Sequence, residues 1–186
     1  KIIVLHGIYL VFLINLLFID YSRFLPANAV YNHSSEYNDI TVFDSGTSRL
    51  FMMNGSHSSG LDIASGKSYF SYIKEVTRII DDERPKKILI IGAAWFSLPQ
   101  DIAERDFVER IDVSDIDESL DTIAEKYFLQ EKLHPKIHFY KESARHFVNK
   151  KGDIGEKYDF IFLDAYSGKL SIPSELLTKD FFESIS

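Results

Sequence analysis

The apolar residues of this chain follow three different patterns. Residues 2–19 are an almost unbroken apolar run, residues 38–53 alternate polar and apolar positions, and from residue 69 onward apolar residues recur at the spacings of helices and buried strands. These patterns predict, in order, a segment removed from water, half-buried strands, and alternating helices and strands. The predicted regions are residues 1–29, 30–68 and 69–186.

The N-terminal apolar run favours an export signal. It follows a single cation, Lys1, and leads to small residues at Ala27 and Ala29, the −3 and −1 positions of a signal-peptidase cut after Ala29. An uncleaved membrane anchor through residues 2–19 is the second interpretation, because about 18 apolar residues approach the minimum length of a span. A buried core helix is the third. The first two interpretations place the domain in the periplasm or on a membrane, and a segment that is not a signal leaves it in the cytoplasm.

Two short strands joined by a tight turn are predicted next. Residues 38–43 and 49–53 alternate polar and apolar side chains. Between them, residues 44–46 are Asp, Ser and Gly, which favour a turn. The pair Asn54-Gly55 favours a second tight turn with positive φ. The Ser- and Gly-rich residues that follow are expected to form a loop or a short further strand.

The remaining residues predict a doubly wound, Rossmann-like α/β domain. An amphipathic helix begins near Tyr69 and ends in the polar residues 81–85. Strand and helix signals then alternate, which indicates a mostly parallel sheet with right-handed crossovers. A sheet of this class usually has further strands, so we expect the sequence to be truncated at its C-terminus. The predicted strands are residues 87–91, 110–113, 137–140 and 160–163, and the predicted helices are residues 99–105, 119–128 and 144–150, with a last helix capped by Thr178.

Composition excludes several kinds of function. The formal net charge is −7 and no long basic run occurs, so neither nucleic acid nor an anionic membrane surface is an expected partner. The chain has no cysteine, which excludes disulfides, thiolate metal sites and a cysteine nucleophile. The histidines lack metal-ligand spacing with nearby acids, so no metal site is predicted. A small or cationic partner fits this composition best.

A glycine at the end of the first parallel strand is the first candidate for chemistry. Gly92 follows the buried residues 87–91, and Asp115 ends the next strand 23 residues later. A glycine turn with an acid about twenty residues further on is the pattern by which doubly wound sheets hold a nucleotide, with the acid accepting hydrogen bonds from the ribose. For an isolated pair, an ordinary tight turn and strand-end acid is an equally good interpretation.

Four segments carry a more specific signal through their order and spacing. They read IGAAWFSLP at residues 91–99, DVSDID at 112–117, SARHF at 143–147 and LDAYSG at 163–168, the last with SIP at 171–173 and LLT at 176–178. Together they resemble the spermidine synthase family, particularly its bacterial spermidine synthase-like branch, over roughly residues 37–182. The resemblance implies a class I methyltransferase-like fold behind a small N-terminal β-hairpin region, used for aminopropyl transfer.

The resemblance also implies a nucleoside site and a catalytic acid. S-adenosylmethionine or its decarboxylated form is expected at Gly92, Asp115, Ile116, Ser143 and Ala144, with Asp115 on the ribose and Ser143 at the adenine-reading position. Asp164 matches the family's catalytic acid, and Tyr72, kept in the substrate pocket, is expected to be the second catalytic residue. A polyamine nucleophile is cationic at neutral pH and must lose a proton before it attacks, so a carboxylate that binds the cation and accepts the proton is needed.

The chain departs from the family pattern at these same places. The glycine-rich loop is reduced to Gly92, and the bulky Trp95 and Phe96 after it are expected to fill the nucleotide pocket rather than to stack on a base. The adenine-reading acid is Ser143, residues 68–74 hold no carboxylate, and the second acid of the catalytic loop is Ser167. Because a diamine needs an anionic partner at each end, we do not expect ordinary spermidine synthesis.

Two functions remain with similar weight. One is a spermidine synthase-like transferase domain that binds an S-adenosyl-type nucleoside and uses Asp164 as acid or base, with a cationic amine as second partner. The other is an inactive exported binding or interaction module in which Trp95 and Phe96 occupy the former site. A small-molecule methyltransferase is a third, and it requires room for a methionine carboxylate near Gly92. The family's frequent pairing through its N-terminal region suggests a homodimer.

Overall fold

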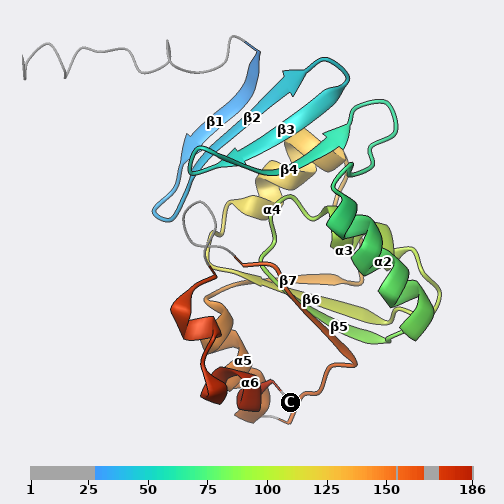
Figure 1. The fold of residues 1–186 in the computed structure, drawn as a ribbon, viewed down its shortest axis with the longest axis vertical. Helices are drawn as coiled ribbons and strands as arrows, with labels where there is room; N and C mark the ends of the chain where they lie inside the picture. The colour runs from blue at the N-terminus through green and yellow to red at the C-terminus, as the bar shows by residue number, and fades with distance from the viewer. Residues whose placement is uncertain (1–27, 154, 166–171, 186) are drawn as a thin grey trace, which may run out of the picture.

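The computed structural model describes residues 28–153, 155–165 and 172–185, which form two sheets with helices packed around the second (Figure 1). Residues 1–27 lie outside this description, so the export signal and the membrane anchor stay predictions. None of the helices in the described residues combines the length and the apolar character that crossing a membrane requires.

The first sheet is antiparallel, with strand order β1-β2-β3-β4. Its central hairpin, β2 and β3, confirms the predicted one, and positive φ angles of 52° and 73° at Asn54 and Gly55 confirm the second turn. The stretch after that turn is a strand, and a first strand that the sequence pattern did not predict pairs with β2. The strands are β1 Ala29–Ser34, β2 Asp39–Ser45, β3 Ser48–Met53 and β4 Ser56–Asp62.

The second sheet is parallel, with strand order β7-β6-β5-β8. This order arises because β6 and β7 extend the sheet to one side of β5 and the chain then returns to add β8 on the other side. The predicted doubly wound α/β class is therefore confirmed. The strands are β5 Lys87–Ile91, β6 Arg110–Asp115, β7 Ile137–Lys141 and β8 Phe160–Leu163.

The helices occur in the predicted order with shifted ends. The helix after β5 starts two residues earlier than predicted, and the predicted helix 119–128 is a short α-helix that continues as a π-helix. Thr178 caps the last helix by accepting a hydrogen bond from the backbone N–H of Phe181, as predicted. The helical segments are α2 Ser71–Glu83, α3 Ser97–Ala103, α4 Leu120–Ile123, η2 Ala124–Leu129, α5 Ala144–Asp153, η3 Ser174–Leu176 and α6 Lys179–Ser184.

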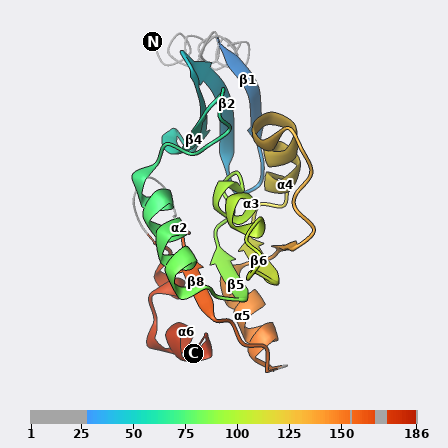
Figure 2. The ribbon, with the colours of Figure 1, turned by 90° about the vertical axis from the view of Figure 1, so that its right-hand side faces the viewer.

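Alternate residues of the buried strands face two different cores. Ile88 and Ile90 of β5 pack with α2, α3, α4 and η2, whereas Leu89 and Ile91 pack with α5 and α6 on the other face. Figure 2 shows α2 and α3 on one side of the sheet and α5 and α6 on the other. The period of two along each strand explains this division, because successive side chains point to opposite faces.

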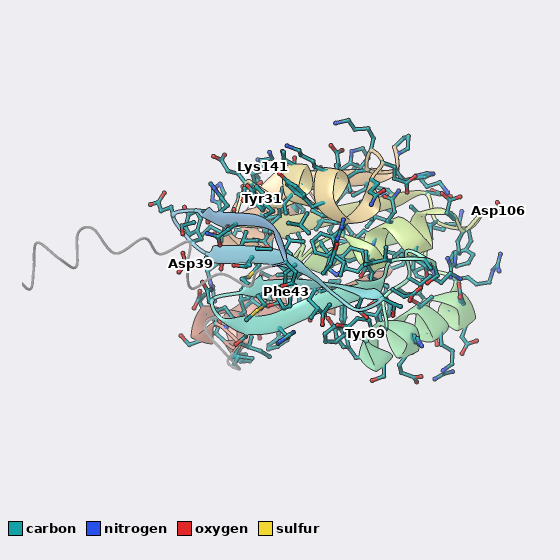
Figure 3. All side chains as sticks on the ribbon, turned by 90° about the horizontal axis from the view of Figure 1, so that it is seen from above. Tyr31, Asp39, Phe43, Tyr69, Asp106 and Lys141 are labelled. Atoms are coloured by element: carbon teal, nitrogen blue, oxygen red, sulfur yellow. The ribbon has the colours of Figure 1, made fainter. Side chains whose placement is uncertain are left out.

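The N-terminal sheet closes over the first of these cores. Its buried residues Ile40, Val42 and Phe51 belong to the same apolar cluster as the helices α2 and α3. Viewed from above in Figure 3, Tyr31 lies on the β1 side of this sheet and Tyr69 on the side of α2. The carboxyl ends of the parallel strands lie beneath the antiparallel sheet, because Asp117, just after β6, bonds to the turn between β1 and β2, and Ser59 of β4 lies beside Gly92.

Candidate active site

The four parallel strands bring the predicted site residues to one edge of the sheet. Ser143 follows β7, Asp115 ends β6, Gly92 follows β5 and Asp164 follows β8. In an open α/β sheet, ligands bind outside the carboxyl ends of the strands. With strands about 4.8 Å apart, the line from Ser143 to Asp164 crosses three spacings, about 14 Å, in the order Ser143, Asp115, Gly92, Asp164.

Gly92 is required by the close passage of the chain after β8. Its φ is +100°, a value that side-chain-bearing residues rarely adopt, and an added Cβ would lie 2.5 Å from the carbonyl oxygen of Asp164. The Gly92 N–H donates to the carbonyl of Ser114, and the Asp164 N–H donates to the carbonyl of Ile91. Gly92 therefore brings the backbones of three strand ends together, as a glycine of a first βα turn is expected to do.

Asp115 faces the loop that begins at Gly92. Its carboxylate accepts hydrogen bonds from the backbone N–H groups of Ala93, at 2.8 Å, and Asp117, at 3.0 Å. Burial raises the pKa of Asp115, and these backbone donors act in the opposite direction. A carboxylate has about four lone-pair positions, so two backbone donors leave acceptor capacity for ribose hydroxyls.

The loop after Gly92 keeps a backbone that suits glycine although its residues are not glycines. Ala94 and Phe96 have φ angles of +43° and +63°, in the left-handed region that side chains disfavour. Such conformations persist only where the surroundings hold them, and they occur most often at functional sites. At Ala94 and Phe96 the loop thus has positive φ angles of the kind that glycine reaches without strain.

Trp95 points from this loop into the shared core. It is 1 % exposed, its indole N–H donates to the hydroxyl of Ser59 on β4, and its ring lies 5.0 Å from that of Phe128 on η2. Phe96 is also buried and packs edge-on against Phe139 of β7. The described contacts of both aromatic side chains are therefore core contacts, and the sequence did not single out Ser59 as the partner of Trp95.

Asp164 and Tyr72 form a pair on the other side of Gly92. The Tyr72 hydroxyl donates to Oδ2 of Asp164 at 3.2 Å. Burial raises the pKa of Asp164 to about 6, although the hydrogen bond from Tyr72 acts in the opposite direction. A small cavity of about 20 Å³ lies beside the pair and is lined by residues of β4, α2, the Gly92 loop, α3 and β8.

The residues predicted to bind adenine lie at the far end of the same edge. Ile116 is 43 % exposed and borders a larger hollow of about 520 Å³, beside Lys141 and the turn between β1 and β2. Ser143 is exposed at the start of α5, where its hydroxyl accepts from the N–H of His146 at 3.4 Å. Ala144 is the first residue of α5. These three residues follow β6 and β7, whereas Asp164 follows β8, so a ligand that meets all of them has to span these strands.

Asp117 was not assigned a role from the sequence, yet it anchors the site to the N-terminal sheet. Its Oδ2 accepts from the hydroxyl of Ser35 at 2.7 Å and from the amide of Asn38 at 2.9 Å, and its Oδ1 accepts from Ser119. Burial opposes ionisation of Asp117, but these donors together lower its pKa. In the sequence, Asp117 stands out only by lying two residues after Asp115. That position does not predict hydrogen bonds to residues about eighty positions earlier.

Among the described residues, no group of three or more acids and histidines has the arrangement of a metal site. Ser167, at the position of the family's second catalytic-loop acid, lies outside the described residues. Of the described residues that line the small cavity, Asp164 is the one with an ionisable carboxyl group.

The parallel sheet has helices on both faces and follows a small antiparallel sheet, and the candidate residues lie at its carboxyl edge. These features define a class I methyltransferase-like α/β domain. Residues 67–186 match the family model of the spermine/spermidine synthase domain. The chain belongs to this family, which confirms the resemblance drawn from the four sequence segments.

Several known proteins are similar to this chain. A polyamine aminopropyltransferase of Vibrio vulnificus is 30% identical over 159 residues, covering 82% of this chain and 52% of that protein. Spermidine synthase 2 of Arabidopsis thaliana is 24% identical over 163 residues, covering 84% of this chain and 46% of that protein. The chain therefore spans about half the length of these relatives.

Solved structures of spermidine synthases share the fold. One, in complex with the transition state analogue AdoDATO, has a TM-score of 0.70 at 20% identity and matches 84% of this chain and 53% of its own. Another, from Thermotoga maritima, has a TM-score of 0.68 at 20% identity and matches 84% of this chain and 52% of its own.

Proposed function

We propose that this domain binds an S-adenosyl-type nucleoside along the carboxyl edge of its parallel sheet, as part of a transferase in which Asp164 accepts or supplies a proton. The base would lie toward Ile116, Ser143 and Ala144, the ribose at Asp115, and the sulfur-bearing end near Gly92 and Asp164. The order of the strand ends supports this placement, because a nucleoside with a 5′ substituent is a chain of groups in that same order.

The observation that carries the proposal is the state of Asp164. It is partly buried beside the glycine turn, the Tyr72 hydroxyl binds one of its oxygens, and burial raises its pKa to about 6. A general base works best when its pKa lies near the pH at which it operates. A strongly perturbed carboxyl group at the edge where ligands bind is a candidate for function.

In aminopropyl transfer, the amine nitrogen attacks the carbon bound to the sulfonium sulfur. The carbon–sulfur bond breaks, its electron pair stays on sulfur, and a neutral thioether leaves. The proton that the nitrogen loses passes to the Asp164 carboxylate. The hydrogen bond from Tyr72 fixes the orientation of that carboxylate, so Tyr72 acts as a positioning residue.

Calorimetric titration of the chain with S-adenosylmethionine, its decarboxylated form and 5′-methylthioadenosine tests the proposal. We expect micromolar binding of at least one of them, about −8 kcal/mol, and its loss in Asp115→Ala. Asp106→Ala, which changes an exposed acid at the opposite end of the domain, is the control (Figure 3). The circular dichroism spectrum of Asp115→Ala must match that of the parent for the loss to count.

A non-catalytic binding module on the same fold is the second candidate. One observation favours it: both Asp115 oxygens already accept backbone N–H groups. Absence of heat with all three nucleosides would support this candidate against the first.

A methyltransferase has less support. The carboxylate of S-adenosylmethionine requires a cationic partner, and none of the described residues that line the cavity beside Gly92 is Lys, Arg or His.

A further inference from the structure

We infer that the outer face of the antiparallel sheet, the face turned away from the parallel strands, rests on the surface of a lipid bilayer. The inference takes residues 2–19 as a membrane anchor, the second interpretation of that apolar run, and it does not depend on the proposed function. It is carried by the apolar character of this face and by its place next to the anchor.

Alternate residues of β2 and β3 point away from the shared core. Val42 and Phe51 are buried beneath the sheet, so their neighbours Phe43 and Leu50 point outward. Neither core cluster of the described residues includes Phe43, Leu50 or Met52. Residues that pair directly across strands share a face, which assigns the others. The middle of the outer face consists of Val30, Asn32, Thr41, Phe43, Leu50, Met52 and His57.

The ring of Tyr69 extends this face across β4. Gly60 pairs with Leu50 and has no side chain to contribute. A Cβ built on Gly60 would lie 2.6 Å from Cζ of Tyr69, so the Tyr69 ring takes the place of that side chain. Tyr69 is 43 % exposed and stacks on Phe70. Figure 3 looks down onto the sheet, with Phe43 near its middle and Tyr69 toward α2. A tyrosine, with an apolar ring and a polar hydroxyl, suits the interface between membrane and water.

The outer face is uncharged although the chain carries a net charge of −7. Among the seven described residues of its middle, His57 is the one ionisable side chain, and Asp39 and Asp62 lie at the strand ends. The exposed face of an antiparallel sheet is normally polar, and an exposed apolar patch marks an interaction surface. The net charge disfavours attraction to anionic headgroups, so the contact depends on the apolar side chains and not on salt.

The position of the anchor identifies the bilayer as the occupant. The nine residues between the apolar run and Ala29 span at most about 32 Å, and Ala29 pairs with Phe43 of the outer face. An anchor therefore holds this face near the bilayer surface. The run itself is not the occupant, because an apolar segment without a polar side needs cover on all sides, and one sheet face covers a single side.

The first test measures how close two parts of the domain lie to lipid. The chain has no cysteine, so Met52→Cys and Asp106→Cys each create one labelling position, the first on the outer face and the second before the amino end of β6, away from the antiparallel sheet. Each full-length variant carries an environment-sensitive dye in phosphatidylcholine vesicles that contain nitroxide-labelled lipid. We expect at least threefold stronger quenching at position 52 than at position 106.

Three results of this test overturn the inference. One is equal quenching at both positions, and another is no quenching at either. The third is blue-shifted emission at position 52 that the labelled lipid does not quench, which means that a second copy of the chain covers the face.

The second test changes the apolar character of the face. In the labelled Met52→Cys variant, Leu50→Asp should lower the quenching to the level at position 106, because a charge in an apolar environment costs free energy. The control Leu50→Met, which stays apolar, should leave the quenching unchanged. Unchanged quenching with Leu50→Asp means that the anchor alone holds the face near the bilayer and overturns the inference, provided that both variants unfold at the temperature of the parent.

Discussion

Among single residues, Gly92 offers the clearest measurable effect. Gly92→Ala should lower the free energy of unfolding by more than about 2 kcal/mol, because φ is +100° and the new Cβ would meet backbone atoms of Asp164 that cannot move aside. Urea denaturation measures this loss. Gly66→Ala is the matched control, since its φ is +68° and nothing lies within 4 Å of the added Cβ. A similar loss in both variants would show that the close approach to Asp164 contributes nothing.

Asp164 should make the domain less stable as the pH rises. Its pKa is raised to about 6 in the folded chain and is about 3.9 in an unfolded chain, so between these values the folded state binds more protons. The stability that the protonated form contributes is fully present below about pH 4. It decreases as the pH rises from about 4 to about 6. Asp164→Asn should therefore stabilise the protein by about 2–3 kcal/mol at pH 7.5 and by little at pH 4, as measured by urea denaturation. A gain of equal size at both pH values would contradict this assignment.

The sequence specified some of these residues and not others. Gly92, Asp115 and Asp164 each directly end or follow a strand, and strand ends can be predicted from apolar runs that stop at a polar residue or glycine. The direction of the Trp95 side chain could not be predicted in this way. It depends on Ser59 and Phe128, which lie 36 residues before it and 33 residues after it. A local sequence pattern does not predict contacts between residues so far apart in the chain.

At the scale of elements, the contact between Trp95 and Ser59 joins the loop after β5 to strand β4. Ser59→Ala should cost about 1–3 kcal/mol, because it leaves a buried indole N–H without its acceptor. Combining it with Trp95→Phe, which removes the donor, should reveal a coupling energy of about 1 kcal/mol in a double-mutant cycle. Additive losses would mean that the hydrogen bond contributes nothing beyond packing.

The elements differ in how far the sequence determined them. Strands β5 and β8 have the predicted bounds, because each is a short apolar run that stops at a glycine or at a polar residue. The predicted helix 119–128 becomes π-helical after Ile123, where Phe128 turns into the core against Phe51 and Trp95. Such a tertiary contact overrides the regular α-helical period of 3.6 residues per turn, and it cannot be predicted from the local sequence.

At the scale of the whole molecule, Asp117 holds the two sheets together. Asp117→Asn should lower the free energy of unfolding by about 1–3 kcal/mol at pH 7, since an amide accepts the bonds from Ser35 and Asn38 less strongly than a carboxylate. The hydrogen bonds lower the pKa of Asp117 despite its burial, so the difference from the parent should vanish as the pH falls below about 4. Asp106→Asn, at an exposed acid, should change little.

Hydrogen exchange distinguishes local from global effects of Asp117→Asn. Because Ile40, Val42 and Phe51 share one core with the parallel sheet, amides of β3 and β5 should lose the same protection. Faster exchange in β3 alone would mean that the antiparallel sheet opens by itself.

The buried Trp95 is an intrinsic fluorescence probe of the loop after Gly92. It is the only tryptophan of the chain, it stands three residues after Gly92, and its indole is removed from water. The intrinsic tryptophan fluorescence of this protein therefore comes from a single point beside the proposed ligand, and it should emit at the short wavelengths of a buried indole. A ligand that shifts the loop would change this emission in the unmodified chain, so binding can be followed by light without an attached dye.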